Sequence, residues 1–422
     1  MTAAWWFLGV SVYGALYTLN AYRPFQFPPA TGWAFFAHWL TTELAAHHLA
    51  WQVLATGVFA TLGAFDHWPG WVGLAITVVS WVGLVGLVRA ARRVEHDVES
   101  ALVEGLGEGY REMLRSDPAD PVARLPRSRL ALPFYFKHRD VRRVADIPYG
   151  PHGRRNRLDV WHHRDPAERA PVLFWVHGGG WAVGHKAQQA LPMITHMTAQ
   201  GWVCVSPNYR LSPRAAWPDH IVDVKRALAW TKEHIAEYGG DPDFIVISGG
   251  SAGGHLAALA ALTPGDAEWQ PGFEDADTSV QGCIPFYGVY DFTNRLRSRP
   301  KMDDWGFRRF LEQRLVGVTR AEHPEVYAKM SPLDQVRADA PPFFLIHGSH
   351  DRLAPVQDAR EFARRLREVS GAPVAFAELP GAQHAFDVFH SVRTTHVVRA
   401  VERFASWVYA THVGSTGRRA AG

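Results

Sequence analysis

The sequence predicts an α/β protein with a mostly parallel eight-stranded sheet, preceded by an all-α transmembrane region. From about residue 140 onward, short apolar or β-branched stretches alternate with helical patterns, as in sheets that are built by strand–helix–strand crossovers. The first 88 residues are different in kind, because they hold only three charged side chains, Arg23, Glu43 and Asp66.

The N-terminal region contains three uncharged runs, at residues 1–22, 44–65 and 67–88. Each run is close to the roughly 20 residues that a helix needs to cross a bilayer, so we expect residues 1–93 to form a three-helix transmembrane region. A large apolar core domain is the alternative. A cleaved signal peptide fits less well, since no Lys or Arg precedes the first run.

Basic residues predict how this region is oriented. Arg89, Arg92 and Arg93 follow the third run, whereas the loop before it carries Asp66 and no Lys or Arg. Cytoplasmic loops hold an excess of Lys and Arg. We therefore expect an integral protein of the cell membrane whose C-terminal domain lies in the cytoplasm.

Residues 94–139 are expected to link the membrane region to the sheet. Apolar side chains recur at positions 94, 98, 102, 106, 110 and 113, which predicts an amphipathic helix that packs on the sheet domain or on a second copy of the chain. The Pro-containing stretch 116–143 is basic. Beside a membrane it would attract anionic head groups by about 1 kcal/mol per charge, and it would equally serve as a solvated tether.

The sheet domain is expected over residues 140–413. Strand patterns begin near residues 143, 157, 172, 203, 244, 283, 343 and 374, with helices near 186–200, 219–237, 252–262, 357–369 and 388–410. The segment 292–340 interrupts this alternation and carries aromatic residues among many charges, which predicts a helical lid. The tail 414–422 is expected to be disordered.

A serine stands between an expected strand and an expected helix, in the run Gly249-Gly250-Ser251-Ala252-Gly253. A strand that turns directly into a helix holds the residue at the turn in a strained conformation and exposes its side chain. The Gly-x-Ser-x-Gly pattern alone is weak, because it arises by chance in roughly one chain in seven of this length. The strand–turn–helix context favours a nucleophile.

Glycines also follow the apolar stretch 171–176, in the run His177-Gly178-Gly179-Gly180. Open α/β sheets bind ligands at the carboxyl ends of their strands, where side chains would block the approach to the backbone. We expect the N–H groups of Gly178, Gly179 and Ala252 to form an oxyanion hole in which each donor is worth about 3 kcal/mol. His177 is expected to orient this loop.

A nucleophilic serine needs a base, and the base needs an orienting carboxylate. Asp351 and His384 each lie in a loop beyond an apolar strand, and the chain order Ser251, Asp351, His384 is one that a serine triad adopts on α/β sheets. Asp387 is the alternative acid.

No metal site is assigned among the 22 histidines. The pairs His47-His48 and His162-His163 lack Cys or carboxylate partners at metal-ligand spacing. The two cysteines, Cys204 and Cys283, fall on expected buried strands, so no disulfide is implied.

From roughly residue 140 to 410 the chain resembles α/β-hydrolases of the hormone-sensitive-lipase and carboxylesterase group, in a membrane-anchored bacterial form. Besides the two glycine motifs, Asn208-Tyr209-Arg210-Leu211 and the run 237–242 are similar to stretches of those enzymes. The resemblance implies the α/β-hydrolase fold and hydrolysis of short- to medium-chain carboxylic esters without a cofactor.

For single residues, the resemblance implies Ser251 as nucleophile, His384 as base and Asp351 as its partner. It also implies an oxyanion hole formed by the same N–H groups, those of Gly178, Gly179 and Ala252. Tyr209 and Arg210 are expected to be structural.

Together these observations predict a membrane-anchored serine carboxylesterase or lipase that acts on small-molecule or lipid-like esters through an acyl-enzyme. An amidase, deacetylase or peptidase with the same triad stays open, as does a catalytically retired scaffold. Glu43, near His38 and the pair His47-His48, leaves open a sensor or transport role. Membrane lipids are expected partners and a homo-oligomer stays open, whereas a net charge of +3 gives no case for nucleic acid.

Overall fold

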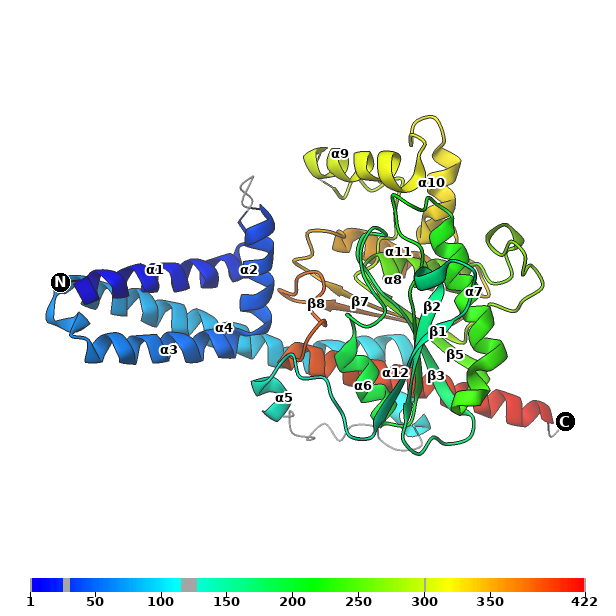
Figure 1. Ribbon diagram of the computed structural model, residues 1–422, viewed down its shortest axis with the longest axis horizontal. Coiled ribbons are helices and arrows are strands. Elements are labelled where there is room, and N and C mark those ends of the chain that lie inside the picture. The colour runs from blue at the N-terminus through cyan, green and yellow to red at the C-terminus, as the bar shows by residue number, and fades with distance from the viewer. Residues whose placement is uncertain (1, 26–30, 115–126, 300, 421–422) are drawn as a thin grey trace.

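The computed structural model describes residues 2–25, 31–114, 127–299 and 301–420. A narrow bundle of helices from the N-terminal region projects from one side of a broad α/β domain (Figure 1). Both chain regions are the ones that the sequence predicts, an all-α region followed by an α/β domain.

Eight strands form one mixed sheet in the order β1-β2-β4-β3-β5-β6-β7-β8. The first two neighbouring pairs, β1 with β2 and β2 with β4, are antiparallel, and the other pairs are parallel. The strands are β1 (Val141–Pro148), β2 (Arg157–His163), β3 (Ala170–Val176), β4 (Val203–Pro207), β5 (Gly240–Gly250), β6 (Gly282–Phe286), β7 (Phe343–Gly348) and β8 (Val374–Leu379). The mostly parallel eight-stranded sheet is thus confirmed.

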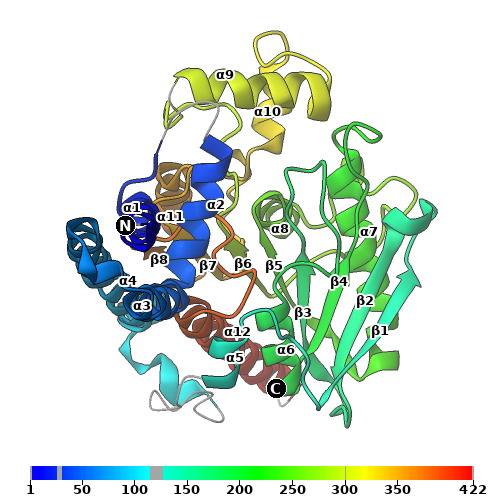
Figure 2. The ribbon, with the colours of Figure 1, turned by 60° about the vertical axis from the view of Figure 1, so that its left-hand side comes forward.

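Helices cover both faces of the sheet (Figure 2). One apolar core lies between the sheet and α7, α8 and α11, and a second lies between the sheet and α6, α12 and the end of α4. The bounds are α6 (Leu191–Ala199), α7 (Asp219–His234), α8 (Ala252–Leu262), α11 (Val356–Val369) and α12 (Val392–Ala420). Cys204 and Cys283 are both free and buried in this domain.

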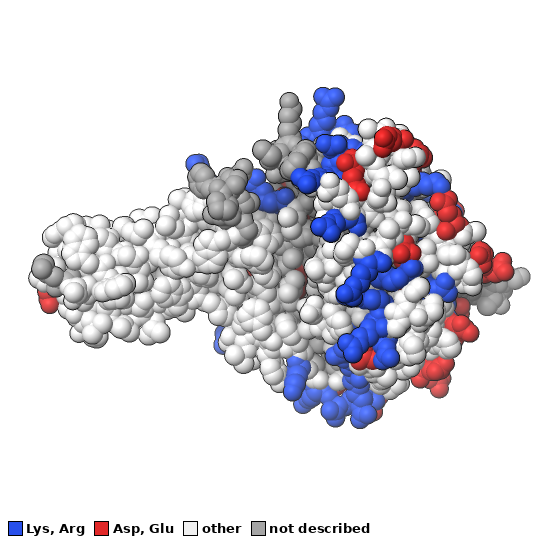
Figure 3. Space-filling view, turned by 45° about the horizontal axis from the view of Figure 1, so that its top comes forward, with Lys and Arg blue, Asp and Glu red and all other residues white. Residues whose placement is uncertain are grey.

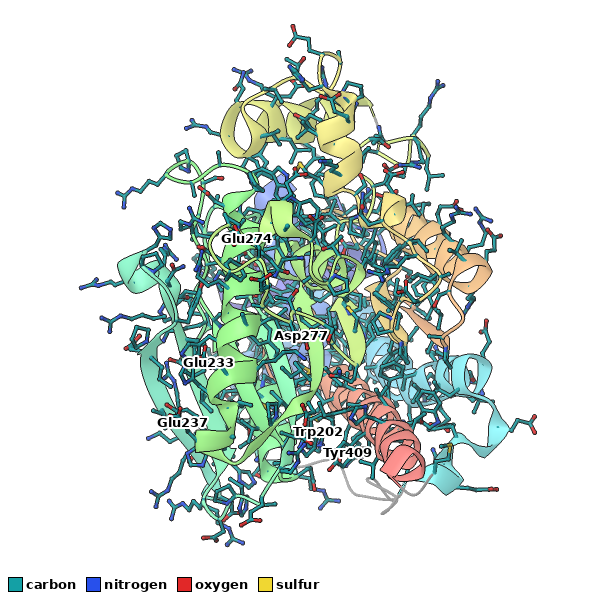
Figure 4. The ribbon with its side chains drawn as sticks, turned by 90° about the vertical axis from the view of Figure 1, so that its right-hand side faces the viewer. Trp202, Glu233, Glu237, Glu274, Asp277 and Tyr409 are labelled. Carbon is teal, nitrogen blue, oxygen red and sulfur yellow. The ribbon has the colours of Figure 1, made fainter. Side chains whose placement is uncertain are left out.

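The last helix, α12, is longer than the sequence predicts. It continues to Ala420, through most of the segment 414–422 for which we expected disorder. Once a helix has formed, each further residue adds one hydrogen bond without a new nucleation cost, so residues of modest helix propensity can extend it. The rings of Tyr409 and Trp202 lie 4.9 and 6.2 Å from the ring of Phe244, so α12 packs on the sheet at this point. Tyr409 and Trp202 are labelled in Figure 4.

The N-terminal region contains α1 (Thr2–Tyr22), α2 (Thr31–Glu43), α3 (Ala45–Thr61) and α4 (Trp68–Leu106). The helices α1, α3 and α4 run side by side, and α2 lies across their end, next to the α/β domain (Figures 1 and 2). Each of the three expected spans is helical, but α3 has only 17 residues. Within the described ranges, α4 is the one helix long and apolar enough to cross a membrane.

The helix α4 joins the bundle to the α/β domain without a break. Its 39 residues cover both the third apolar run and the start of the expected amphipathic helix. Val94, Val98 and Leu102 are fully buried in the core that α6 and α12 share with the sheet. Of the two packing partners that the sequence leaves open for this stripe, the α/β domain is the one it contacts.

A helical insertion follows β6, as the interrupted pattern over 292–340 predicts. It contains α9 (Lys301–Phe310), a π-helical stretch (Leu311–Val316) and α10 (Pro324–Met330). The insertion contacts the helix behind the expected nucleophile, because His255 of α8 donates from Nε2 to the carbonyl of Met330, at 2.8 Å. Its function as a lid stays a prediction.

The close packing of α4 on β8 gives a test of the fold. A Cβ on Gly105 would lie 2.6 Å from the Cα of Ala375, whereas a Cβ on Gly306 of α9 would meet nothing within 4 Å. Alanine favours a helix over glycine by up to ~1 kcal/mol. We expect Gly306→Ala to keep or raise the melting temperature, and Gly105→Ala to lower the free energy of unfolding by about 1–3 kcal/mol, because the backbone of α4 or β8 must shift. Equal melting temperatures would contradict the packing of α4 on β8.

Candidate active site

Ser251 occupies a strained turn between β5 and α8. Its backbone has φ 58° and ψ −121°, a conformation that is costly for any residue with a side chain. The flanking glycines permit the turn, because a Cβ on Gly253 would lie 2.0 Å from the carbonyl oxygen of Val176 and one on Gly249 would lie 2.4 Å from that of Gly253. The sheet, the helix and the two glycines together hold Ser251 in a conformation that it would not adopt alone.

His384 and Asp351 form a buried pair at the carboxyl ends of β8 and β7. His384 Nδ1 lies 2.7 Å from Asp351 Oδ2, and both side chains are at most 6% exposed. Asp351 Oδ1 accepts hydrogen bonds from the backbone N–H groups of Leu353 and Ala354, at 2.8 and 2.9 Å. The structure therefore brings together the two residues that the sequence expects as base and acid.

The pKa of Asp351 lies below its usual value despite full burial. Burial alone would raise the pKa, but His384 and His347 stabilise the carboxylate by charge and hydrogen bonding. His347 Nε2 lies 3.4 Å from Asp351 Oδ2 and donates to the carbonyl of Ala354, at 2.9 Å. The sequence alone assigns His347 no role, although its position at a strand end four residues before Asp351 is a usable signal.

Asp387, the alternative acid, has a different partner. It accepts a short hydrogen bond from the hydroxyl of Tyr287, and burial raises its pKa to about 6 although that bond lowers it. The carboxylate that bonds His384 Nδ1 is that of Asp351.

Ser251 and the His384–Asp351 pair share Tyr287 as a neighbour. The ring of Tyr287 lies 4.6 Å from the ring of His384, and a Cβ on Gly250, next to the serine, would lie 2.9 Å from the Tyr287 hydroxyl. Across the described residues, no hydrogen bond joins Ser251 directly to His384. Such bonds are often loose in ligand-free enzymes and tighten with substrate.

The glycine loop after β3 lies against the serine, but one expected donor is occupied. A Cβ on Gly178 would lie 3.0 Å from the Cβ of Ser251, so the loop is within reach of the site. The N–H of Gly178, however, donates to Gln189 Oε1 at 2.7 Å, and it is therefore not free to bind an oxyanion in this structure. The N–H groups of Gly179, Gly180 and Ala252 have no partner within the described part of the chain.

The partner of Gly178 comes from the next loop along the chain, where Gln189 lies. Gly179 and Gly180 both have positive φ, 119° and 58°, and the carbonyl of Gly179 accepts from the N–H groups of Ala182 and Val183, so the glycine run forms a tight turn. Nothing in the sequence around Gln189 signals that its amide would reach back to Gly178.

His177, Tyr209 and Arg210 stabilise the glycine loop and its surroundings. The rings of His177 and Tyr209 are stacked at 4.4 Å, and the Tyr209 hydroxyl donates to the carbonyl of His177 at 3.0 Å. Burial lowers the pKa of His177 to about 4. Arg210 pairs with Asp223 through two hydrogen bonds to its carboxylate, each of 2.9 Å.

Residues 2–25, 31–114, 127–299 and 301–420 contain no group of three or more His, Cys, Asp or Glu side chains placed to hold a metal ion.

Two ester hydrolases are similar to this protein over nearly the whole chain. A probable carboxylic ester hydrolase of Mycobacterium tuberculosis, LipM, is 45% identical over 97% of this chain and 94% of its own length. The chain belongs to the hormone-sensitive-lipase and carboxylesterase group of α/β-hydrolases. The expected family is thereby confirmed.

Further matches agree with this family. The esterase LipQ of the same species is 41% identical over 92% of this α/β-hydrolase chain and 87% of its own length. The family model described as BD-FAE matches residues 158–366. A solved thermophilic esterase from Thermogutta terrifontis is similar with a TM-score of 0.51 and 25% identity, over 66% of this chain and 93% of that one. The solved esterase matches about two thirds of the chain, whereas LipM and LipQ match nearly all of it.

The two buried aspartates allow a matched test of the acid. We expect Asp351→Asn to lower kcat on the order of 10⁴-fold, because an amide cannot hold the His384 tautomer that the expected Ser251–His384–Asp351 triad requires. Asp387→Asn is the control and should stay within about tenfold of the wild type. Steady-state ester hydrolysis measures both variants, and the opposite order of effects would assign the acid to Asp387.

The raised pKa of Asp387 also predicts a pH dependence of stability. The folded protein holds this proton up to a pH of about 6, whereas an unfolded aspartate releases it near pH 4, so burial of Asp387 destabilises the fold as pH rises through this window. The penalty above pH 6 is at most about 3 kcal/mol. Thermal unfolding of Asp387→Asn and wild type should give a difference in melting temperature that favours the variant more at pH 7.5 than at pH 4.5. A difference that does not change with pH would contradict the raised pKa.

Proposed function

We propose that this chain is a membrane-anchored carboxylic ester hydrolase that works through Ser251, His384 and Asp351. The observation that carries the proposal is the buried His384–Asp351 pair at the sheet edge on which the strained turn presents Ser251. The esterase names of LipM and LipQ favour ester over amide bonds as the substrate.

In the proposed mechanism, His384 Nδ1–H donates to Asp351, which leaves Nε2 as the nitrogen that takes the proton from Ser251. The serine oxygen attacks the ester carbonyl, and the protonated histidine then gives its proton to the leaving alcohol. Water then attacks the carbonyl of the acyl-enzyme while His384 takes its proton. His384 returns this proton to the oxygen of Ser251 as the carboxylic acid leaves. The low pKa of Asp351 keeps it ionised, so it stabilises the imidazolium in both steps.

The oxyanion of each tetrahedral intermediate is proposed to bind the N–H groups of Gly179, Gly180 and Ala252. Ala252 is the first residue of α8, so the positive end of the helix dipole adds to its N–H. A donor of this kind typically contributes about 3 kcal/mol to the transition state.

The packing of the bundle supports membrane anchoring. Small or weakly polar residues of the first half of α4, among them Gly73, Thr77 and Ser80, face the other helices, and Thr77 and Ser80 bond to hydroxyls of α1 at 2.9 and 2.8 Å. Large apolar residues face outward, with Val79 73% and Val82 70% exposed. This pattern is the reverse of that in water-soluble bundles, where large apolar residues face inward. It is typical of helices that associate inside a bilayer, where small residues permit close packing.

The arginines of α4 support an orientation with the α/β domain in the cytoplasm. The bundle surface is almost free of charged side chains, and acidic side chains gather toward the far end of the α/β domain (Figure 3). Glu233, Glu237, Glu274 and Asp277 lie on that far side (Figure 4). The arginines of α4 follow its apolar half, where the bundle meets the domain, in agreement with the positive-inside rule.

The decisive experiment compares wild type and Ser251→Ala. Detergent-solubilised protein is assayed with p-nitrophenyl esters from acetate to palmitate. We expect the variant to lose on the order of 10⁴- to 10⁶-fold in kcat with an unchanged melting temperature, because only the nucleophile is removed. Activity of the variant within tenfold of wild type would reject Ser251 as the nucleophile.

A further inference from the structure

The helix α2 of the bundle contacts the loop that carries the catalytic base. Trp39 Nε1 donates to the carbonyl of Ala385, at 3.0 Å, and Ala385 directly follows His384. The ring of Trp39 also packs against Phe389, at 5.2 Å between centroids. One residue of α2 therefore holds the base loop both by a hydrogen bond and by apolar packing.

The same helix contacts the loop of the acid. The ring of His38 lies 5.8 Å from the ring of His350, which directly precedes Asp351. His38 is tied in turn to α1, because its Nδ1 donates to the carbonyl of Asn20 at 2.9 Å. The contact thus runs from the bundle through α2 to both loops of the buried pair.

A buried ion pair fixes the end of α2 to the start of α12. Glu43 Oε1 lies 2.5 Å from Arg393 Nη1, and both side chains are 1% exposed. The hydroxyl of Ser391 donates to Glu43 Oε2 at 2.9 Å. Arg393 also reaches the carbonyl of Pro380, at the other end of the loop that carries His384.

These contacts restrain the His384 loop at three points. Arg393 bonds its beginning at Pro380, Trp39 bonds its middle at Ala385, and Glu43 holds the residues that end it. Ala385 has a positive φ of 61°, a conformation that a non-glycine residue keeps only when its surroundings impose it. A hydrogen bond to its carbonyl is one such restraint.

We propose that α2 is a positioning element for catalysis, which holds His384 in the place where it can take the proton of Ser251. Trp39 and Glu43 are its positioning residues, and neither touches the reacting atoms. The inference rests on the proposed roles of Ser251 and His384. It adds that the α/β domain reaches full turnover only with the N-terminal helices docked, since displacement of a base by about 1 Å can cost on the order of 100-fold in rate.

Trp39→Phe tests the proposal in the full-length, detergent-solubilised protein. The change keeps an aromatic ring against Phe389 and removes the N–H that bonds Ala385. We expect kcat for p-nitrophenyl butyrate to fall about tenfold, with KM unchanged within twofold, because binding of the ester is not affected. The rate of labelling by a fluorophosphonate probe should fall in parallel, since it reports the activation of Ser251.

Trp33→Phe is the matched control, because Trp33 lies on the same helix with a side chain that is 59% exposed. It should keep wild-type kcat and labelling. A kcat of Trp39→Phe within twofold of wild type would overturn the proposal, and so would an equal loss in the Trp33 variant.

Glu43→Gln gives a second, independent variant. We expect it to lower kcat at least as far as Trp39→Phe, because the amide cannot neutralise Arg393 and the loop loses a fixed end. If this variant does not fold, Trp39→Phe still decides. Ser251→Ala is run beside both: active Ser251→Ala protein would reject the proposed function, whereas an inactive one together with an unaffected Trp39→Phe would reject the role of α2 alone.

Discussion

The continuity of α4 is the constraint on which the rest of the structure depends. A helix of 39 residues is about 58 Å long. The second half of α4 is part of the core of the α/β domain, so the apolar first half extends beyond that domain. Because α4 is buried against β8 and α12 at one end, the bundle can leave the domain in only one direction (Figure 1). This direction places α2, which crosses the end of the bundle, over the loops that follow β7 and β8.

The sheet supplies the second constraint, since parallel strands bring loops from distant parts of the chain to one edge. Ser251, Asp351 and His384 each follow a strand, and β5, β6, β7 and β8 are consecutive neighbours. The sheet alone does not set the side-chain geometry. That geometry depends on local features, the strained turn at Ser251 and the two N–H groups that fix the carboxylate of Asp351.

The parts that the sequence predicts are those encoded by local pattern. All eight strands, the helix after Ser251 and the amphipathic stripe of α4 follow from periodicity and from the position of glycines. No local signal predicts contacts between residues of different loops or of distant parts of the chain. Such contacts are the Gly178–Gln189 bond, the Tyr287–Asp387 bond and the Glu43–Arg393 pair. The end of α12 was mispredicted for a related reason, because helix extension depends on the helix before it more than on the tail residues themselves.

Glu43 is an acidic residue within an apolar part of the chain, and its ion pair with Arg393 explains its presence there. A single acid in an apolar stretch suggests an ion path or a sensor, but here its charge is neutralised by Arg393 of the α/β domain. A buried pair of this kind adds little net stability, since desolvation of both charges offsets their attraction, yet loss of either partner is costly. Such a pair is better suited to fix one docking geometry than to strengthen the fold.

The proposed membrane anchoring gives this docking geometry a function, because α2 then lies near the membrane surface with Trp33 and Phe36 exposed and with the loop of His384 directly behind it. Under the proposed anchoring, esters dissolved in the bilayer would meet the proposed catalytic loops close to the interface, while the ion pair keeps those loops in register with the N-terminal helices.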